Sequence, residues 1–172
     1  ASARDTVFVQ AGSPSRESVE QYQALSAEID DIVARVNATY PASGDRDAIV
    51  YLKENLAREE MLALFVAADV MVVTSLADGM NLVAKEFVAC RDDDSGILIL
   101  STEAGAAEAM GEALLVNPRS GPEIVRAFET AVQMNPDEEA RRMRELRREV
   151  SINDVAQWAR DILGDLEKAR VN

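Results

Sequence analysis

The residues most able to do chemistry lie in one short segment, residues 75–86, which reads SLADGMNLVAKE. Two acids in it, Asp78 and Glu86, flank a glycine and an apolar run, a pattern typical of a strand that turns into a helix. The first backbone amides of such a helix have no partner within it and lie at the positive end of the helix dipole. An anion-binding site is therefore predicted at the amides of Asn81, Leu82 and Val83.

The two acids favour a sugar-like ligand beside that anion. Asp78 directly precedes the amides, where its carboxylate can hold sugar hydroxyls, and Gly79 permits close approach of the backbone to a ligand. Glu86 lies within two turns of the helix start, where its carboxylate can accept hydrogen bonds from a ribose diol. The alternative is that Asp78 only caps the helix and that Glu86 is a surface acid. The spacing alone does not decide between the two.

Strand-like and helix-like segments alternate over the first two thirds of the chain and would position this turn. Short apolar runs rich in β-branched residues predict strands at 6–10, 49–52, 70–74, 96–101 and 113–116. Apolar residues at three- and four-residue steps predict helices at 15–38, 56–67, 81–91 and 106–110. This alternation predicts an α/β fold with a doubly wound, mostly parallel sheet, whose ligands bind beyond the carboxyl ends of the strands.

After Pro118 the pattern changes, and no strand is expected. Three helices are predicted at residues 122–134, 137–150 and 152–169. We therefore expect a lobe over residues 1–118, followed by C-terminal helices over residues 119–172 that pack on it. The Arg- and Glu-rich second helix is typical of a solvated face with ion pairs one turn apart, rather than of a basic binding patch.

Composition excludes several classes of function. The 172 residues hold 18 Lys+Arg and 31 Asp+Glu, a net charge of −13, which argues against binding to nucleic acid or to an anionic membrane. The absence of histidine excludes Ser-His-Asp and Cys-His catalysis and His-ligated zinc. The single cysteine cannot form an internal disulfide, which favours the cytoplasm. No apolar run approaches the roughly 18 residues of a membrane span.

Residues 78–89 closely resemble the signature of trehalose-6-phosphate synthases, which are retaining nucleotide-sugar glycosyltransferases with two Rossmann-like lobes (the GT-B type). Further similarities follow in the family's order and spacing over nearly the whole chain, at residues 13–16, 51–52, 56–60, 67–70, 104–107, 115–118 and 153–159. The resemblance implies the C-terminal donor lobe without its first strand and helix. The acceptor lobe and the cationic pair that clamps the diphosphate are absent, so we expect this chain to be inactive by itself.

The same resemblance assigns roles to individual residues. Asp78 would contact the transferred sugar at the catalytic centre, and Glu86 would bind the ribose hydroxyls. Arg16 would pair with the phosphate of the acceptor, because the planar guanidinium fork matches phosphate oxygens. The sugar and diphosphate would be lined by Gly79, Met80, Asn81, Leu82 and Val83, and the base would be bordered by Leu56 and Met61.

The reaction that the resemblance implies is transfer of a glycosyl unit, with retention, from a nucleotide diphosphate sugar to a sugar-phosphate-like acceptor. No cofactor and no metal are expected, because amides and cationic side chains stabilise the leaving diphosphate. The expected partner is the missing N-terminal lobe, and neither nucleic acid nor a membrane is expected. Trp158 is expected to anchor the last helix to its neighbours. The apolar face that this helix would turn toward the other lobe is expected to be exposed here, which predicts self-association into a homo-oligomer.

Two departures from the family pattern leave other chemistries open. Ala77 stands where the family commonly has Arg, and Thr102-Glu103 replaces a more usual acid–aromatic pair. The alternatives are a pseudo-glycosyltransferase that couples a nucleotide-cyclitol to a phosphorylated amino-cyclitol, a glucosylglycerol-phosphate synthase, and a non-catalytic fragment. The sequence does not distinguish a uracil from a guanine donor.

Overall fold

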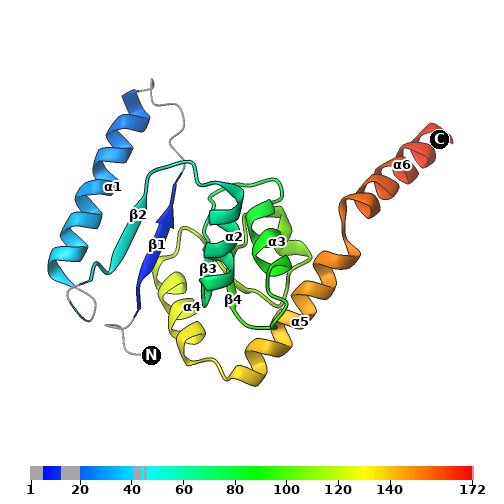
Figure 1. Ribbon diagram of the computed structural model, residues 1–172. Coiled ribbons are helices and arrows are strands. Elements are labelled where there is room, and N and C mark those ends of the chain that lie inside the picture. Colours follow the sequence, from blue (N-terminus) through cyan, green and yellow to red (C-terminus); the bar gives the residue numbers. More distant parts are fainter. Residues whose placement is uncertain (1–5, 13–19, 41–43, 45, 172) are drawn as a thin grey trace. The chain divides into compact units, whose positions relative to one another are not determined.

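The computed structural model describes residues 6–12, 20–40, 44 and 46–171, which fall into two compact units, Ala1–Glu60 and Met61–Asn172. Among the helices of the described residues, none has the length and apolar character that crossing a membrane requires. The elements, in chain order (Figure 1), are β1 (Phe8–Ala11), α1 (Glu20–Thr39), β2 (Ile49–Leu52), α2 (Arg58–Ala67), β3 (Val70–Val73), α3 (Leu82–Ala89), β4 (Ile97–Ser101), η2 (Gly105–Glu108), β5 (Leu114–Val116), α4 (Gly121–Gln133), α5 (Pro136–Ile152) and α6 (Val155–Val171).

The first unit contains a β-α-β arrangement in which β1 and β2 pair in parallel and α1 connects them. The side chain of Asn37, near the end of α1, mimics a neighbouring strand. Its Nδ2 donates to the Ile49 carbonyl (2.9 Å), and its Oδ1 accepts from the Ile49 amide (2.8 Å). These two bonds fix the position of α1 against β2.

The second unit is built on a three-stranded parallel sheet in the order β3–β4–β5. The middle strand β4 is buried throughout, as the two-sided apolar pattern of a central strand requires. Leu98 and Leu100 pack in a cluster with residues of α3 and α5, whereas Ile97 and Ile99 pack with residues of α4. Helices thus cover both faces of this sheet. The predicted parallel α/β class is confirmed, with the strands in two sheets, one in each unit.

Most predicted elements are present, with shifts at their ends. The first strand lies at Phe8–Ala11 instead of 6–10. The helix predicted from residue 56 begins at Arg58, because the Glu60 carboxylate accepts from the Ala57 amide (2.8 Å) and caps the helix there. The helix predicted at 106–110 is the short 3₁₀ turn η2.

The last two helices meet later than predicted. Helix α5 continues to Ile152, and α6 begins only at Val155 instead of residue 152. The start of α6 is set by Asp154, whose Oδ1 accepts from the Gln157 amide (2.8 Å) as a helix cap. The polar run around residue 153 suits both a helix end and a cap, so the sequence alone did not locate the break.

Ion pairs on α5 confirm its interpretation as a solvated, paired helix. The Glu138 carboxylate accepts from Arg141 Nε (2.8 Å) and from Arg142 Nε (2.7 Å), and Arg141 also donates to Glu112 (2.8 Å). These bonds, that from Arg141 first, lower the pKa of Glu138 from 4.5 to about 2. The Arg141 guanidinium likewise lowers the pKa of Glu112.

A pH dependence of stability follows from these pKa values. Because the folded pKa of Glu138 is depressed, its stabilising contribution is present above about pH 4.5 and is lost as the pH falls toward 2. We expect the melting temperature to decline through this window, and less steeply in Glu138→Gln. Melting followed by circular dichroism between pH 2 and 6 measures both slopes. Equal slopes for the variant and the unaltered chain would contradict the assignment.

Candidate functional site

The turn singled out in the sequence lies beside a second turn at the carboxyl ends of β3 and β4. These are the β3–α3 loop (residues 74–81) and the β4–η2 segment (residues 102–106). Backbone hydrogen bonds join them: Asp78 N to Glu103 O (3.1 Å), Gly105 N to Asp78 O (2.9 Å) and Ala106 N to Met80 O (2.8 Å). An isolated parallel bridge pairs Asp78 with Ala104. The β3–α3 loop is therefore held by the neighbouring strand's turn.

The carboxylate of Asp78 is fixed within this loop. One oxygen accepts from the Met80 amide (3.0 Å), and the other accepts from Asn81 Nδ2 (3.0 Å). The Met80 amide first, and then the Asn81 side chain, hold the pKa of Asp78 below its usual value, so the group is ionised at neutral pH. Each carboxylate oxygen can accept a further hydrogen bond, which leaves capacity for a ligand hydroxyl.

Helix α3 is capped by Asn81, and the alternative of Asp78 as the cap is wrong. Asn81 has a left-handed backbone (φ 75°, ψ 85°), and its Oδ1 accepts from the Ala84 amide (2.9 Å). Positive φ is uncommon for residues other than glycine, and Asn tolerates it better than most. Loop and helix thus meet at a residue whose side chain bonds in both directions, to Asp78 and to Ala84.

Two open amides remain at the start of α3. Within the described part of the chain, the Leu82 and Val83 amides have no hydrogen-bond partner, as predicted. The expectation for a third open amide is corrected, because the Asn81 amide also interacts with the Asp78 carboxylate and lowers its pKa. The side chains of Leu82 and Val83 are exposed at 61% and 40%, so the helix start faces outward. This end of α3 can receive an anion.

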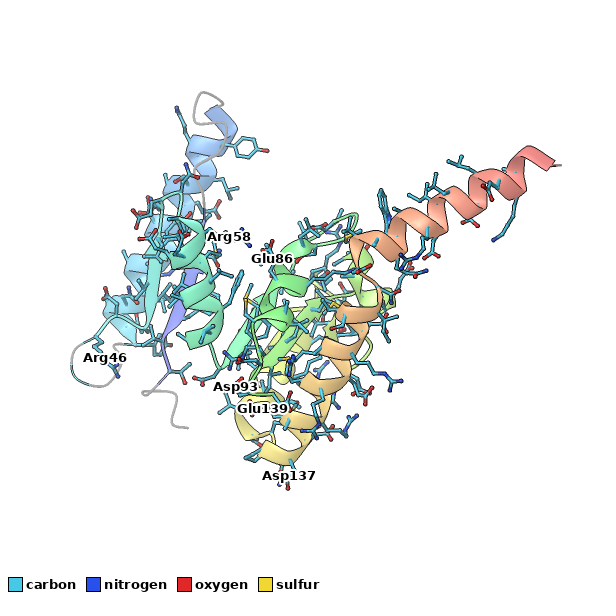
Figure 2. All side chains as sticks on the ribbon, turned by 45° about the vertical axis from the view of Figure 1, so that its right-hand side comes forward. Arg46, Arg58, Glu86, Asp93, Asp137 and Glu139 are labelled. Atoms are coloured by element: carbon cyan, nitrogen blue, oxygen red, sulfur yellow. The ribbon has the colours of Figure 1, made fainter. Side chains whose placement is uncertain are left out.

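The remaining predicted site residues, Glu86, Met61, Leu56 and Arg16, lie outside the β3–α3 loop. Glu86 lies one turn after Leu82 on α3, where Figure 2 shows its exposed side chain. Met61 is half-buried and packs against the core of the second unit. Leu56 is half-buried and belongs to the first unit. Arg16 lies outside the described residues.

Two residues that hold the two loops together, Ser101 and Gly105, were not identified from the sequence. Ser101 is fully buried, and its hydroxyl donates to the Ser75 carbonyl (2.7 Å) and accepts from the Glu103 amide (3.0 Å). At Gly105, an added Cβ would lie 2.3 Å from the carbonyl oxygen of Gly79. At Gly79 itself an added Cβ would meet nothing within 4 Å, so the close approach inside the protein occurs at Gly105.

A mostly apolar cavity of about 530 Å³ opens beside the β3–α3 loop, at Met80. Trp158, expected to anchor the last helix, lines this cavity and is 54% exposed. Among the described residues, no group of three or more His, Cys, Asp or Glu could hold a metal ion. The cavity is lined by Met80, Leu82, Lys85, Val150, Asn153, Asp154, Val155, Trp158 and Asp161.

Known proteins resemble this chain over most of its length. The trehalose-6-phosphate synthase of Mycolicibacterium smegmatis is 49% identical over 162 residues, which are 94% of this chain and 32% of that protein. A UDP-forming α,α-trehalose-phosphate synthase from Burkholderia xenovorans, solved with glucose-6-phosphate, is 34% identical with a TM-score of 0.87. The matched region covers 94% of this chain and 35% of the Burkholderia chain.

An E. coli trehalose-6-phosphate structure bound with UDP-2-fluoro glucose is 35% identical, with a TM-score of 0.87. The matched region covers 93% of this chain and 36% of the E. coli chain. The chain thus spans about a third of the length of these relatives. They give no support to a pseudo-glycosyltransferase or a glucosylglycerol-phosphate synthase. The model of glycosyltransferase family 20 matches residues 2–168, and the chain therefore belongs to this family.

Proposed function

We propose that this chain is the donor-binding part of a retaining glycosyltransferase that moves a glycosyl unit from a nucleotide diphosphate sugar to a sugar phosphate. The observation that carries the proposal is the pairing of an ionised carboxylate, Asp78, with two open amides, Leu82 and Val83, in one fixed loop. The amides suit a diphosphate, and the carboxylate suits the hydroxyls of the attached sugar.

The identity of the substrates rests on the relatives. One of them was solved with UDP-2-fluoro glucose and another with glucose-6-phosphate. We therefore propose UDP-glucose as the donor and glucose 6-phosphate as the acceptor, with trehalose 6-phosphate as the product. Glu86 would bind the ribose, Leu56 and Met61 would border the base, and Arg16 would pair with the acceptor phosphate.

Catalysis in this proposal depends on placement and charge. As the bond to the sugar breaks, negative charge develops on the leaving diphosphate, and the Leu82 and Val83 amides would stabilise it without a metal ion. Asp78 would hold the sugar hydroxyls while the bond breaks. The net charge of −13 works against anionic ligands, so such local positive groups must outweigh the field of the chain.

The rest of the active site belongs, in this proposal, to an N-terminal lobe like the part of the relatives that this chain does not span. Residues 1–118 would form the Rossmann-like lobe and residues 119–172 the helices on it, a division supported by the burial of Met143 and Leu146 of α5 in the core. Exposed apolar residues on α6, among them Trp158 and Leu166, support self-association of the separate chain. A cytoplasmic location is supported by the single cysteine.

A chimera tests the proposed activity. The chain would replace the matching 162 residues of the M. smegmatis relative, and transfer from UDP-glucose to glucose 6-phosphate would be followed by NMR of the product. We expect an α,α-linked disaccharide phosphate, which reports retention. The unaltered relative is the positive control. A folded chimera that binds UDP-glucose but shows no transfer to any phosphorylated sugar would favour a non-catalytic module.

The variant Gly79→Ala separates a ligand contact from a folding role. An alanine Cβ at this position meets nothing within 4 Å, so the melting temperature should not change. If the sugar diphosphate approaches the backbone here, the added methyl group should weaken UDP-glucose binding by about tenfold, or ~1.4 kcal/mol. An NMR titration measures the dissociation constant. An unchanged constant would show that the ligand does not approach Gly79.

A further inference from the structure

We propose that Gly105 is a positioning residue for the donor site: contact between it and the Gly79 carbonyl sets the course of the β3–α3 loop. This inference rests on the proposed function of that loop. A Cβ on Gly105 would lie 2.3 Å from Gly79 O, 3.0 Å from Gly79 C and 3.5 Å from Met80 Cα. Its φ lies outside the left-handed region, so the contact, and not backbone conformation, requires glycine.

The β4–η2 segment cannot easily yield to such a clash. It follows β4, the most buried strand, and its residues Ala104 and Ala106 are only 2% and 4% exposed. The buried Ser101 hydroxyl binds the Glu103 amide at its start and the Ser75 carbonyl of the neighbouring loop. A side chain at position 105 would therefore displace the more exposed partner, the backbone of the β3–α3 loop.

A displaced Gly79 would also move the groups proposed to bind the ligand, the Asp78 carboxylate and the Leu82 and Val83 amides, because they are only a few residues away in the chain. Met80 follows Gly79 directly, and its amide is bound by the Asp78 carboxylate. The next residue is Asn81, whose left-handed backbone directs the chain into α3 and so aims the Leu82 amide. A shift of about 1 Å is enough to spoil aligned contacts and to cost up to ~100-fold in function. Gly105 would thus act on the ligand only through the loop.

The test compares Gly105→Ala with Gly111→Ala in the 172-residue chain. Both variants add one methyl group to a glycine of the second unit, but a Cβ on Gly111 meets nothing within 4 Å. Without ligand, Gly105→Ala should shift the amide resonances of residues 78–83 in two-dimensional NMR spectra, and Gly111→Ala should not. With UDP, the dissociation constant should rise about 10- to 100-fold in Gly105→Ala only.

The affinity for uridine, which lacks the diphosphate, distinguishes a misplaced loop from a general loss of structure in Gly105→Ala. Misdirected amides should reduce the preference for UDP over uridine, whereas partial unfolding would weaken both ligands equally. If Gly105→Ala does not fold, Ser101→Ala serves instead, because it loosens the β4–η2 segment without adding atoms. It should lower the same preference.

The outcomes for the loop and for the ligand are distinguishable. Normal UDP affinity in folded Gly105→Ala, or unshifted amides at residues 78–83, would overturn the role of Gly105 and leave the proposed function standing. No binding of UDP by the unaltered chain would overturn the proposed function instead. Equal weakening by Gly111→Ala would also overturn the inference, since that variant causes no clash.

Discussion

Arg91→Met should destabilise the second unit by about 3 kcal/mol or more, because it removes three hydrogen bonds that a buried, charged side chain donates to backbone carbonyls. Arg91 is 4% exposed. Its Nη1 donates to Phe65 O (3.0 Å) and Val66 O (2.5 Å), in the last turn of α2, and its Nε donates to Ser95 O (2.8 Å). The guanidinium also lies over the Phe87 ring, with Cζ 5.5 Å from the ring centroid. One side chain thus joins α2, α3 and the loop before β4.

Urea unfolding measures this loss, with Arg148→Met as the matched control. The Arg148 side chain is 72% exposed, and its one ion pair among the described residues is with Glu145 at 3.9 Å. Its replacement should therefore change the free energy of unfolding by less than about 0.5 kcal/mol. Arg91→Lys keeps the charge but lacks the planar fork, and it should fall between the two. Equal unfolding midpoints for the two methionine variants would contradict the role assigned to Arg91.

Asp78→Asn should have the largest effect on the sugar end of the proposed donor. The carboxylate accepts from the Met80 amide and Asn81 Nδ2, and the variant replaces one acceptor oxygen with an NH₂ group that cannot accept. Hydrogen bonds to a charged group contribute about 1.5–3 kcal/mol, so affinity for UDP-glucose should fall about 10- to 100-fold. UDP, which has no sugar beyond the diphosphate, should lose less.

Calorimetric or NMR titrations with UDP-glucose and UDP give the two ratios, and Asp92→Asn is the control. Asp92 is exposed, with no hydrogen bond or ion pair in the described part of the chain, so neither affinity should change. Equal losses for UDP-glucose and UDP in Asp78→Asn would mean that Asp78 only shapes the loop. No loss for UDP-glucose would contradict its contact with the sugar.

The sequence predicted the parallel α/β class and the open amides because both depend on local pattern. Apolar runs and helical periods suffice to place β3 before α3, and the first amides of a helix have no partner within the helix itself. The choice between Asp78 and Asn81 as the cap was not predictable in this way. Both are good caps three residues apart, and the left-handed backbone of Asn81 decides between them.

The remaining differences depend on contacts between distant segments. Gly79 and Gly105 look alike in sequence, and only the pairing of their two loops shows which one is enclosed. Arg91 stands in the polar run RDDDSG, which is typical of a solvated turn, yet it is buried because the end of α2 lies beside it. Trp158 was expected to anchor α6, and about half of its surface is exposed.

In the proposed donor complex, the Leu82 and Val83 amides at the start of α3 hold the diphosphate. The most direct test is an NMR titration of the 172-residue chain with UDP, with uridine as the control. UDP should shift the Leu82 and Val83 amide resonances most, with smaller shifts at Glu86, and uridine should leave the first two in place. Absence of shifts at Leu82 and Val83 at saturating UDP, or equal shifts with uridine, would contradict this position of the diphosphate.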